Sequence, residues 1–148
     1  MKWGKTGILL VIVSLILVLS LAVFSSGKEV NSPSNFIEET QIHVYSDKVI
    51  FDIDDPIWAR FTDTNSMDPF IDEDSHAIQM SPKDPSVIQV GDVISYKTDN
   101  GTIIHRVTKI SEDKEGIYFV VKGDNNLFRD TTKVRFEDVH GVVVAVIY

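Results

Sequence analysis

An uninterrupted apolar run near the amino terminus limits what the first part of this chain can form. Residues 7–24, GILLVIVSLILVLSLAVF, contain no charged residue and only two serines among bulky aliphatic side chains. As a helix, these residues would rise about 27 Å, which is close to the hydrocarbon thickness of a bilayer. The run therefore predicts one transmembrane helix over residues 7–24.

The same run has two interpretations, a cleaved signal peptide or an uncleaved signal anchor. It is long for the apolar region of a signal peptide, and Phe24 interrupts the small residues that a cleavage site needs. These features favour the anchor. Lys2 and Lys5 precede the run, whereas Lys28 stands beside Glu29 after it, which favours a cytoplasmic tail over residues 1–6 and an extracytoplasmic remainder.

Composition changes after the run. Residues 25–40 are rich in Ser, Asn, Gly and Pro and predict a linker. All 22 acidic residues follow the run together with 12 of the 14 basic ones, so this part carries a net charge of −10. An acidic surface of this kind disfavours nucleic acid as a partner. The absence of cysteine excludes disulfides, thiolate catalysis and zinc–thiolate sites.

Short β-branched and aromatic runs separated by turn residues occupy residues 41–148. Asn100-Gly101 is a strong hairpin signal between the runs near 93–97 and 102–110. A second hairpin is expected to turn through residues 111–116 and end on Gly116. The aliphatic run 139–148 reads as a buried strand, being too short to span a membrane as a helix. We therefore expect a mainly β domain over residues 41–148.

Three places concentrate reactive side chains. Ser66 lies in an acidic, loop-like stretch, His105 lies in a strand-like run, and Asp124 and Asp130 flank the turn after another strand. Each has a structural explanation when taken alone, since serine suits loops, histidine is often a structural residue in a strand, and GDNN is a natural turn. The three residue types alone are a weak signal for a serine nucleophile with a histidine base.

The local strings around these residues carry more information. NSMDP, VGDVISY, IIHRVTKI and VVKGDNNLFRD occur in this order. They resemble the conserved blocks of type I signal peptidases of the S26 serine peptidase family, specifically the archaeal and endoplasmic-reticulum branch. The bacterial branch has a lysine where this chain has His105. The resemblance implies a signal-peptidase-like (LexA-like) β-fold for the catalytic domain, behind the amino-terminal helix.

The resemblance also implies roles for individual residues. Ser66 would be the nucleophile, His105 the general base, and Asp130 the residue that orients the histidine. Asp124 is a second acidic candidate, which would either contact the histidine or brace the turn. The Ser66 backbone N–H and the Thr64 hydroxyl would form the oxyanion hole. This chemistry needs no metal and no cofactor.

The function implied is a membrane-anchored serine endopeptidase that removes signal peptides from exported preproteins. Its partners would be these preproteins, the lipid bilayer and the protein-export machinery. Two alternatives remain open. One is a specialised or self-cleaving relative with a dedicated substrate, and the other is a tethered β-domain that binds partners without catalysis.

The chain departs from the family pattern in two ways. Asn65 precedes the nucleophile where the family commonly has glycine, although asparagine tolerates unusual backbone angles better than most residues. Ser66 lies 42 positions after Phe24, which is farther from the anchor than usual. The first departure concerns the shape of the nucleophile loop, and the second concerns the choice of substrate.

Overall fold

The computed structural model describes residues 4, 7, 9–17 and 30–148. The chain divides into two units, residues 1–30 and 31–148. In the first unit, residues 7 and 9–17 are helical. No helix built from the described residues has the length and apolar character needed to cross a membrane. The predicted transmembrane segment, residues 7–24, lies partly outside the described residues.

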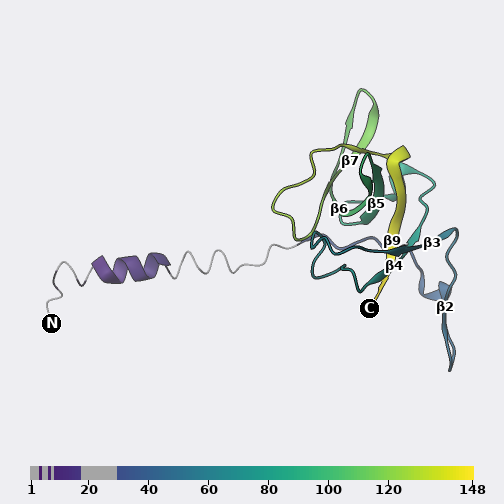
Figure 1. Ribbon diagram of the computed structural model, residues 1–148, viewed down its shortest axis with the longest axis horizontal. Coiled ribbons are helices and arrows are strands. Elements are labelled where there is room, and N and C mark those ends of the chain that lie inside the picture. Colours follow the sequence, from purple (N-terminus) through teal and green to yellow (C-terminus); the bar gives the residue numbers. More distant parts are fainter. Residues whose placement is uncertain (1–3, 5–6, 8, 18–29) are drawn as a thin grey trace. The chain divides into compact units, whose positions relative to one another are not determined.

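The second unit is mainly β, as predicted, and all its strand pairs are antiparallel. It holds a two-stranded sheet, β1-β2, and a seven-stranded sheet in the order β3-β4-β9-β5-β6-β7-β8 (Figure 1). The strands are β1 (Ile42–Val44), β2 (Val49–Phe51), β3 (Pro56–Arg60), β4 (His76–Met80), β5 (Val93–Thr98), β6 (Gly101–Asp113), β7 (Gly116–Lys122), β8 (Val134–Arg135) and β9 (Val139–Ile147). The short 3₁₀ helices are η1 (Glu39–Gln41), η2 (Pro85–Val87) and η3 (Phe136–Asp138).

Two hairpins of the large sheet confirm the turn predictions. β5 pairs with β6 through Thr98 and Gly101, and β6 pairs with β7 through Asp113 and Gly116. Both glycines have positive φ angles, 120° at Gly101 and 105° at Gly116, a backbone region that glycine enters without steric cost. The turn residues therefore set the register of the three strands around His105.

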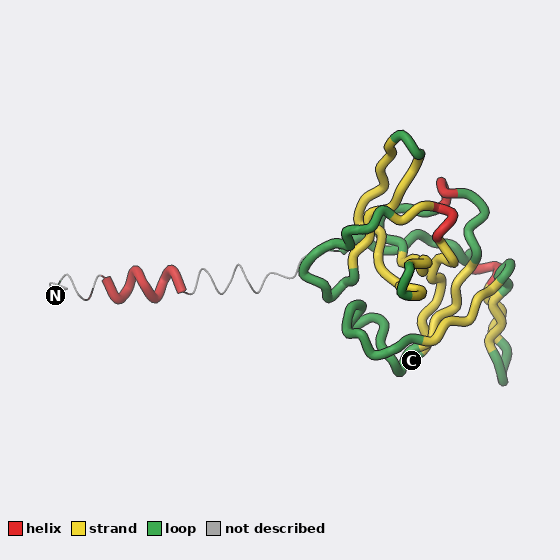
Figure 2. The backbone as a smooth tube through the Cα atoms, turned by 45° about the horizontal axis from the view of Figure 1, so that its top comes forward, coloured by secondary structure: helices red, strands yellow, loops and turns green. Residues whose placement is uncertain are grey.

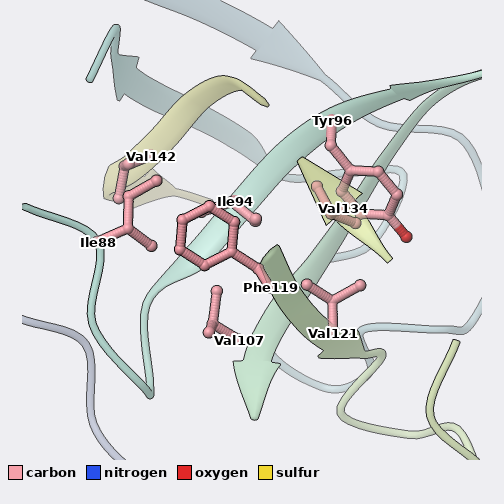
Figure 3. Close-up of a cluster of buried hydrophobic side chains, with 8 residues drawn as sticks. All are labelled: Ile88, Ile94, Tyr96, Val107, Phe119, Val121, Val134 and Val142. Carbon is pink, nitrogen blue, oxygen red and sulfur yellow. The ribbon is translucent and has the colours of Figure 1, made fainter. Parts of the chain in front are cut away.

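Apolar side chains gather in two clusters. The larger one draws on β5, β6, β7, β8 and β9 and contains the side chains shown in Figure 3, namely Ile88, Ile94, Tyr96, Val107, Phe119, Val121, Val134 and Val142. The second contains Met67, Ile71, Ala77, Val93 and Val143. Ile94 and Val93 are adjacent on β5 but belong to different clusters, because successive side chains of a strand point to opposite faces. The sheet is thus buried on both faces in its central part, and the predicted terminal strand, β9, contributes to both clusters.

The segment before η1 lies along the β-unit. The Ser34 N–H donates to Asp92 Oδ1 at 2.6 Å, and the Phe36 ring packs against the larger cluster. A Cβ on Gly91 would lie 2.2 Å from the Ser32 carbonyl oxygen, so only glycine allows this approach. Residues 31–40, expected as part of a linker over 25–40, therefore belong to the compact β-unit.

The hairpin of β1 and β2 projects from the rest of the β-unit in both views (Figures 1 and 2). Its strands have three residues each and pair only with one another among the described residues. Figure 2 also shows long loops between the strands of the large sheet. Two of these loops, between β3 and β4 and between β7 and β8, carry Ser66 and Asp130.

Candidate active site

Ser66 is held by the residue that follows it. Met67 is 2% exposed and belongs to the second core cluster, and its carbonyl accepts the N–H groups of Phe70 and Ile71 at 2.9 and 3.0 Å. The buried methionine and the tight turn after it fix the backbone at Ser66, while the serine itself is half-buried. The loop therefore presents the hydroxyl from a rigid support.

Asn65 has a φ angle of +53°, in the left-handed region. Only glycine enters this region freely, and asparagine is the residue that most often replaces it there. The Asn65 carbonyl also accepts a hydrogen bond from Asn125 Nδ2 at 2.9 Å, which helps to hold the unusual conformation. Asparagine at position 65 thus meets a backbone requirement that glycine would also meet.

This conformation gives a first prediction. Asn65→Gly should fold with near-native stability, because glycine adopts the same φ angle. Asn65→Val should lose about 1–3 kcal/mol of unfolding free energy, because a β-branched residue is strained at positive φ. Urea denaturation of the two variants beside the wild type measures the difference. Equal stability of the glycine and valine variants would show that the backbone at this position is not strained.

His105 lies on β6, 6% exposed, and its imidazole is held from one side. Its Nδ1 lies 2.8 Å from Asp130 Oδ2, and the Tyr96 hydroxyl donates to the same carboxylate oxygen. Asp130 is fixed by its backbone N–H, which donates to the Val121 carbonyl at 2.9 Å. Of the two acidic candidates, Asp130 is the one that contacts the histidine.

Asp124 is paired with Arg106 instead. The guanidinium Nε and Nη2 atoms donate to the two carboxylate oxygens at 2.8 and 2.6 Å. Arg106 Nη1 also donates to the Gly91 carbonyl at 2.7 Å. Arg106 follows His105 on the strand and so points to the opposite face of the sheet. The Asp124 carboxylate thus braces the turn after β7, which is one of the two roles that the sequence analysis left open for it.

The turn KGDNN holds the loop that carries Ser66 in place. The Asn125 N–H donates to the Ser66 carbonyl at 3.0 Å, and the Asp124 N–H approaches Met67 Sδ at 3.4 Å. A Cβ on Gly123 would lie 2.4 Å from the Ser66 carbonyl oxygen, so glycine is required for this contact. Gly123, Asp124 and Asn125 therefore each contribute to the packing of this turn against the loop that carries Ser66.

An open pocket of ≈ 370 Å³ brings Ser66, Thr64 and His105 together. Thr64 Oγ1 lies 3.2 Å from Ser66 Oγ. Within residues 30–148, no hydrogen bond joins Ser66 to His105. The remaining lining residues are Arg60, Phe61, Thr62, Met67, Ile71, Thr102, Ile103, Ile104 and Asn126.

The part of the chain that the structure describes offers no group of three or more His, Cys, Asp or Glu side chains placed to hold a metal ion.

Tyr96 and Asn125 were not selected from the sequence as site residues. The signal for Tyr96 lies in the hairpin register, which pairs Ile94 with His105 and so places Tyr96 on the histidine's face of the sheet. The signal for Asn125 is weaker, because nothing in the sequence indicates that its turn packs against a loop 60 residues earlier.

Comparison with known proteins gives one relative. The chain is 28% identical over 140 residues to signal peptidase I W of Bacillus subtilis (strain 168). The aligned part covers 94% of this chain and 64% of the relative, so the chain spans about two thirds of the length of the curated protein it matches. The chain is similar to a signal peptidase. This similarity supports a signal-peptidase-like function, whereas no family model and no solved structure matches the chain.

Proposed function

We propose that this protein is a membrane-anchored serine endopeptidase of the signal peptidase I type, acting through a histidine base. The observation that carries the proposal is the pocket shared by Ser66 and His105, with the histidine held by Asp130 on its far nitrogen. Similarity to signal peptidase I W supports the same reaction class. The histidine in place of a lysine supports the archaeal and endoplasmic-reticulum branch.

The proposed chemistry assigns one role to each group. Ser66 Oγ attacks the carbonyl carbon of the scissile peptide bond, and His105 Nε2 accepts the hydroxyl proton. The tetrahedral oxyanion is held by the Ser66 N–H and the Thr64 hydroxyl, each contributing on the order of 3 kcal/mol. The imidazolium then returns the proton to the leaving amine, and water, activated by the same imidazole, hydrolyses the acyl-enzyme.

Asp130 accepts the Nδ1–H, which leaves Nε2 free to act as the base. It also stabilises the imidazolium that forms when His105 takes the proton. Asp124, paired with Arg106, holds the turn that supports Ser66 and takes no direct part in proton transfer. The reaction requires neither metal nor cofactor.

The substrate would bind as an extended strand. β3 is an edge strand of the large sheet, and Arg60 at its end lines the pocket together with Phe61 and Thr62. An extended peptide can add to such an edge through backbone hydrogen bonds. The apolar lining around Ser66 suits small side chains at the first and third positions before the cleaved bond. Exported preproteins present such sequences on the outer side of the membrane. Residues 7–24 would anchor the domain on that side, in contact with the export machinery.

The direct test offers purified wild-type protein several unrelated preproteins and sequences the new amino termini. Cleavage is expected after a small residue. A bulky residue in its place should lower kcat/KM by roughly 10- to 200-fold, because it cannot enter the pocket. Matched preproteins that differ only at this position provide the control. Cleavage of one preprotein alone, or of the enzyme itself, would favour the specialised relative, and no cleavage of any would favour a binding domain.

A further inference from the structure

Tyr96 brings a hydroxyl into the site that the mechanism above does not use. It lies on β5 and is 1% exposed, and its ring is part of the larger core cluster. Figure 3 shows the hydroxyl oxygen on the side of the ring away from Ile88 and Phe119. A buried phenol of this kind needs a hydrogen-bond partner, and its partner here is a carboxylate.

One oxygen of Asp130 receives two donors. The Tyr96 hydroxyl and His105 Nδ1 both lie within hydrogen-bond distance of Oδ2, and the phenol oxygen is 3.5 Å from Nδ1. The tyrosine and histidine rings are tilted by 56° with centroids 6.4 Å apart. The carboxylate is therefore fixed from two directions, by a group from β5 and a group from β6.

Asp130 has few other constraints. Apart from its backbone N–H, the hydrogen bonds recorded for it among the described residues are those to Tyr96 and His105. The loop before it carries Leu127 and Phe128 with 83% and 77% exposure, so these side chains do not pack the loop onto the core. Without Tyr96, the carboxylate would depend on His105 alone for its orientation.

We propose that Tyr96 is a positioning residue, which locks the Asp130 carboxylate so that the carboxylate in turn holds the His105 imidazole with Nε2 toward the pocket. This inference rests on the proposed function and adds to it a residue that acts through another. Tyr96 itself does not reach the substrate in this arrangement, because Asp130 and His105 stand between its hydroxyl and the reacting atoms.

The hydroxyl remains a donor throughout the working pH range. Burial, together with the neighbouring Asp130 carboxylate, raises the pKa of the Tyr96 phenol well above its ordinary value. A phenol that stays protonated can donate only one hydrogen bond, and the carboxylate is the acceptor that it contacts. The tyrosine thus works as a fixed donor and not as a second base.

Tyr96→Phe keeps the ring in the core and removes only the hydroxyl. We expect kcat for preprotein cleavage to fall by about 10- to 100-fold, which corresponds to the free energy that a hydrogen bond to a charged group usually contributes. KM should change less than about twofold, because substrate contacts are unaltered. Tyr45→Phe, which removes a hydroxyl from an exposed tyrosine, serves as the matched control and should leave both constants unchanged. A doubled KM with unchanged kcat would overturn the inference.

A second measurement does not depend on activity. In protein labelled with ¹⁵N-histidine, the Nδ1–H proton of His105 should give a sharp downfield resonance, which broadens by exchange with water in Tyr96→Phe. An unchanged resonance in that variant would overturn the role of Tyr96, even if the protein cleaves preproteins as proposed. A wild type that cleaves nothing would overturn the proposed function and leave this comparison valid.

A third test does not need Tyr96→Phe, should that variant fail to fold. A hydroxyl proton donated to a buried carboxylate exchanges slowly with solvent, so a slowly exchanging tyrosine hydroxyl resonance is expected. The resonance should disappear in Asp130→Ala. Its absence from the folded wild type, or its persistence in Asp130→Ala, would rule out the Tyr96–Asp130 contact.

Discussion

Ser66→Ala should abolish preprotein cleavage, with a loss in kcat on the order of 10⁶-fold. The reason is chemical, because alanine has no atom that can attack the peptide carbonyl, while the rest of the pocket is unchanged. His105→Ala should cause a loss of similar size, since Ser66 then lacks a base. The double variant should be no worse than either single one, because the two residues act as a unit.

The fold should survive the first of these substitutions. The Ser66 hydroxyl contacts only the Thr64 hydroxyl, at 3.2 Å, among the hydrogen bonds of the described residues, so its loss should change stability by less than about 0.5 kcal/mol. Time courses of processing, followed on gels alongside circular dichroism, measure both effects. Ser81→Ala, in an exposed loop, is the matched control and should retain full activity. Cleavage retained by Ser66→Ala would remove Ser66 from the mechanism.

Asp124→Ala should produce the largest loss of stability, about 3–5 kcal/mol of unfolding free energy. The ion pair with Arg106 is mostly buried, the two side chains being 16% and 8% exposed, so alanine would leave an uncompensated guanidinium inside the protein. The same change loosens the turn that holds the Ser66 carbonyl, so activity should fall as well. Urea denaturation measures the first effect, and preprotein cleavage the second.

Two further variants separate the buried charge from other effects of the mutation. Asp54→Ala removes an exposed carboxylate whose ion pair with Lys83 is 3.9 Å long, and it should leave the urea midpoint nearly unchanged. Replacing both members of the buried pair, as Arg106→Met with Asp124→Leu, should recover part of the stability lost in Asp124→Ala. A loss below about 1 kcal/mol in Asp124→Ala would contradict a structural role for the pair.

Local signals in the sequence predicted the secondary structure well. Asn100-Gly101 and Gly116 located two hairpins, because positive φ angles at these turns require specific residues. The alternation of short apolar runs indicated a mainly β domain. These features depend on neighbouring residues, so they can be read without knowledge of the rest of the fold.

Contacts between distant segments could not be read in the same way. The spacing of Asp124 and Asp130 did not decide which carboxylate reaches His105, because the answer depends on the path of the loop after β7. The burial of Phe36 was also missed, since the composition of residues 25–40 is that of a linker. Tyr96 was not predicted as a site residue, because a tyrosine in an apolar strand has the pattern of an ordinary core aromatic. Only the hairpin register shows that it lies on the same face of the sheet as His105.

The contacts between the KGDNN turn and the loop that carries Ser66 have a consequence for when the proposed activity can begin. Asn125 contacts Asn65, a residue 60 positions earlier, and Asp130 comes later still. During synthesis, a chain that has grown only through β6 contains Ser66 and His105 but lacks the turn that holds one and the carboxylate that orients the other. Under the proposed function, such a nascent chain would have no peptidase activity until β7 and the loop after it have joined the sheet.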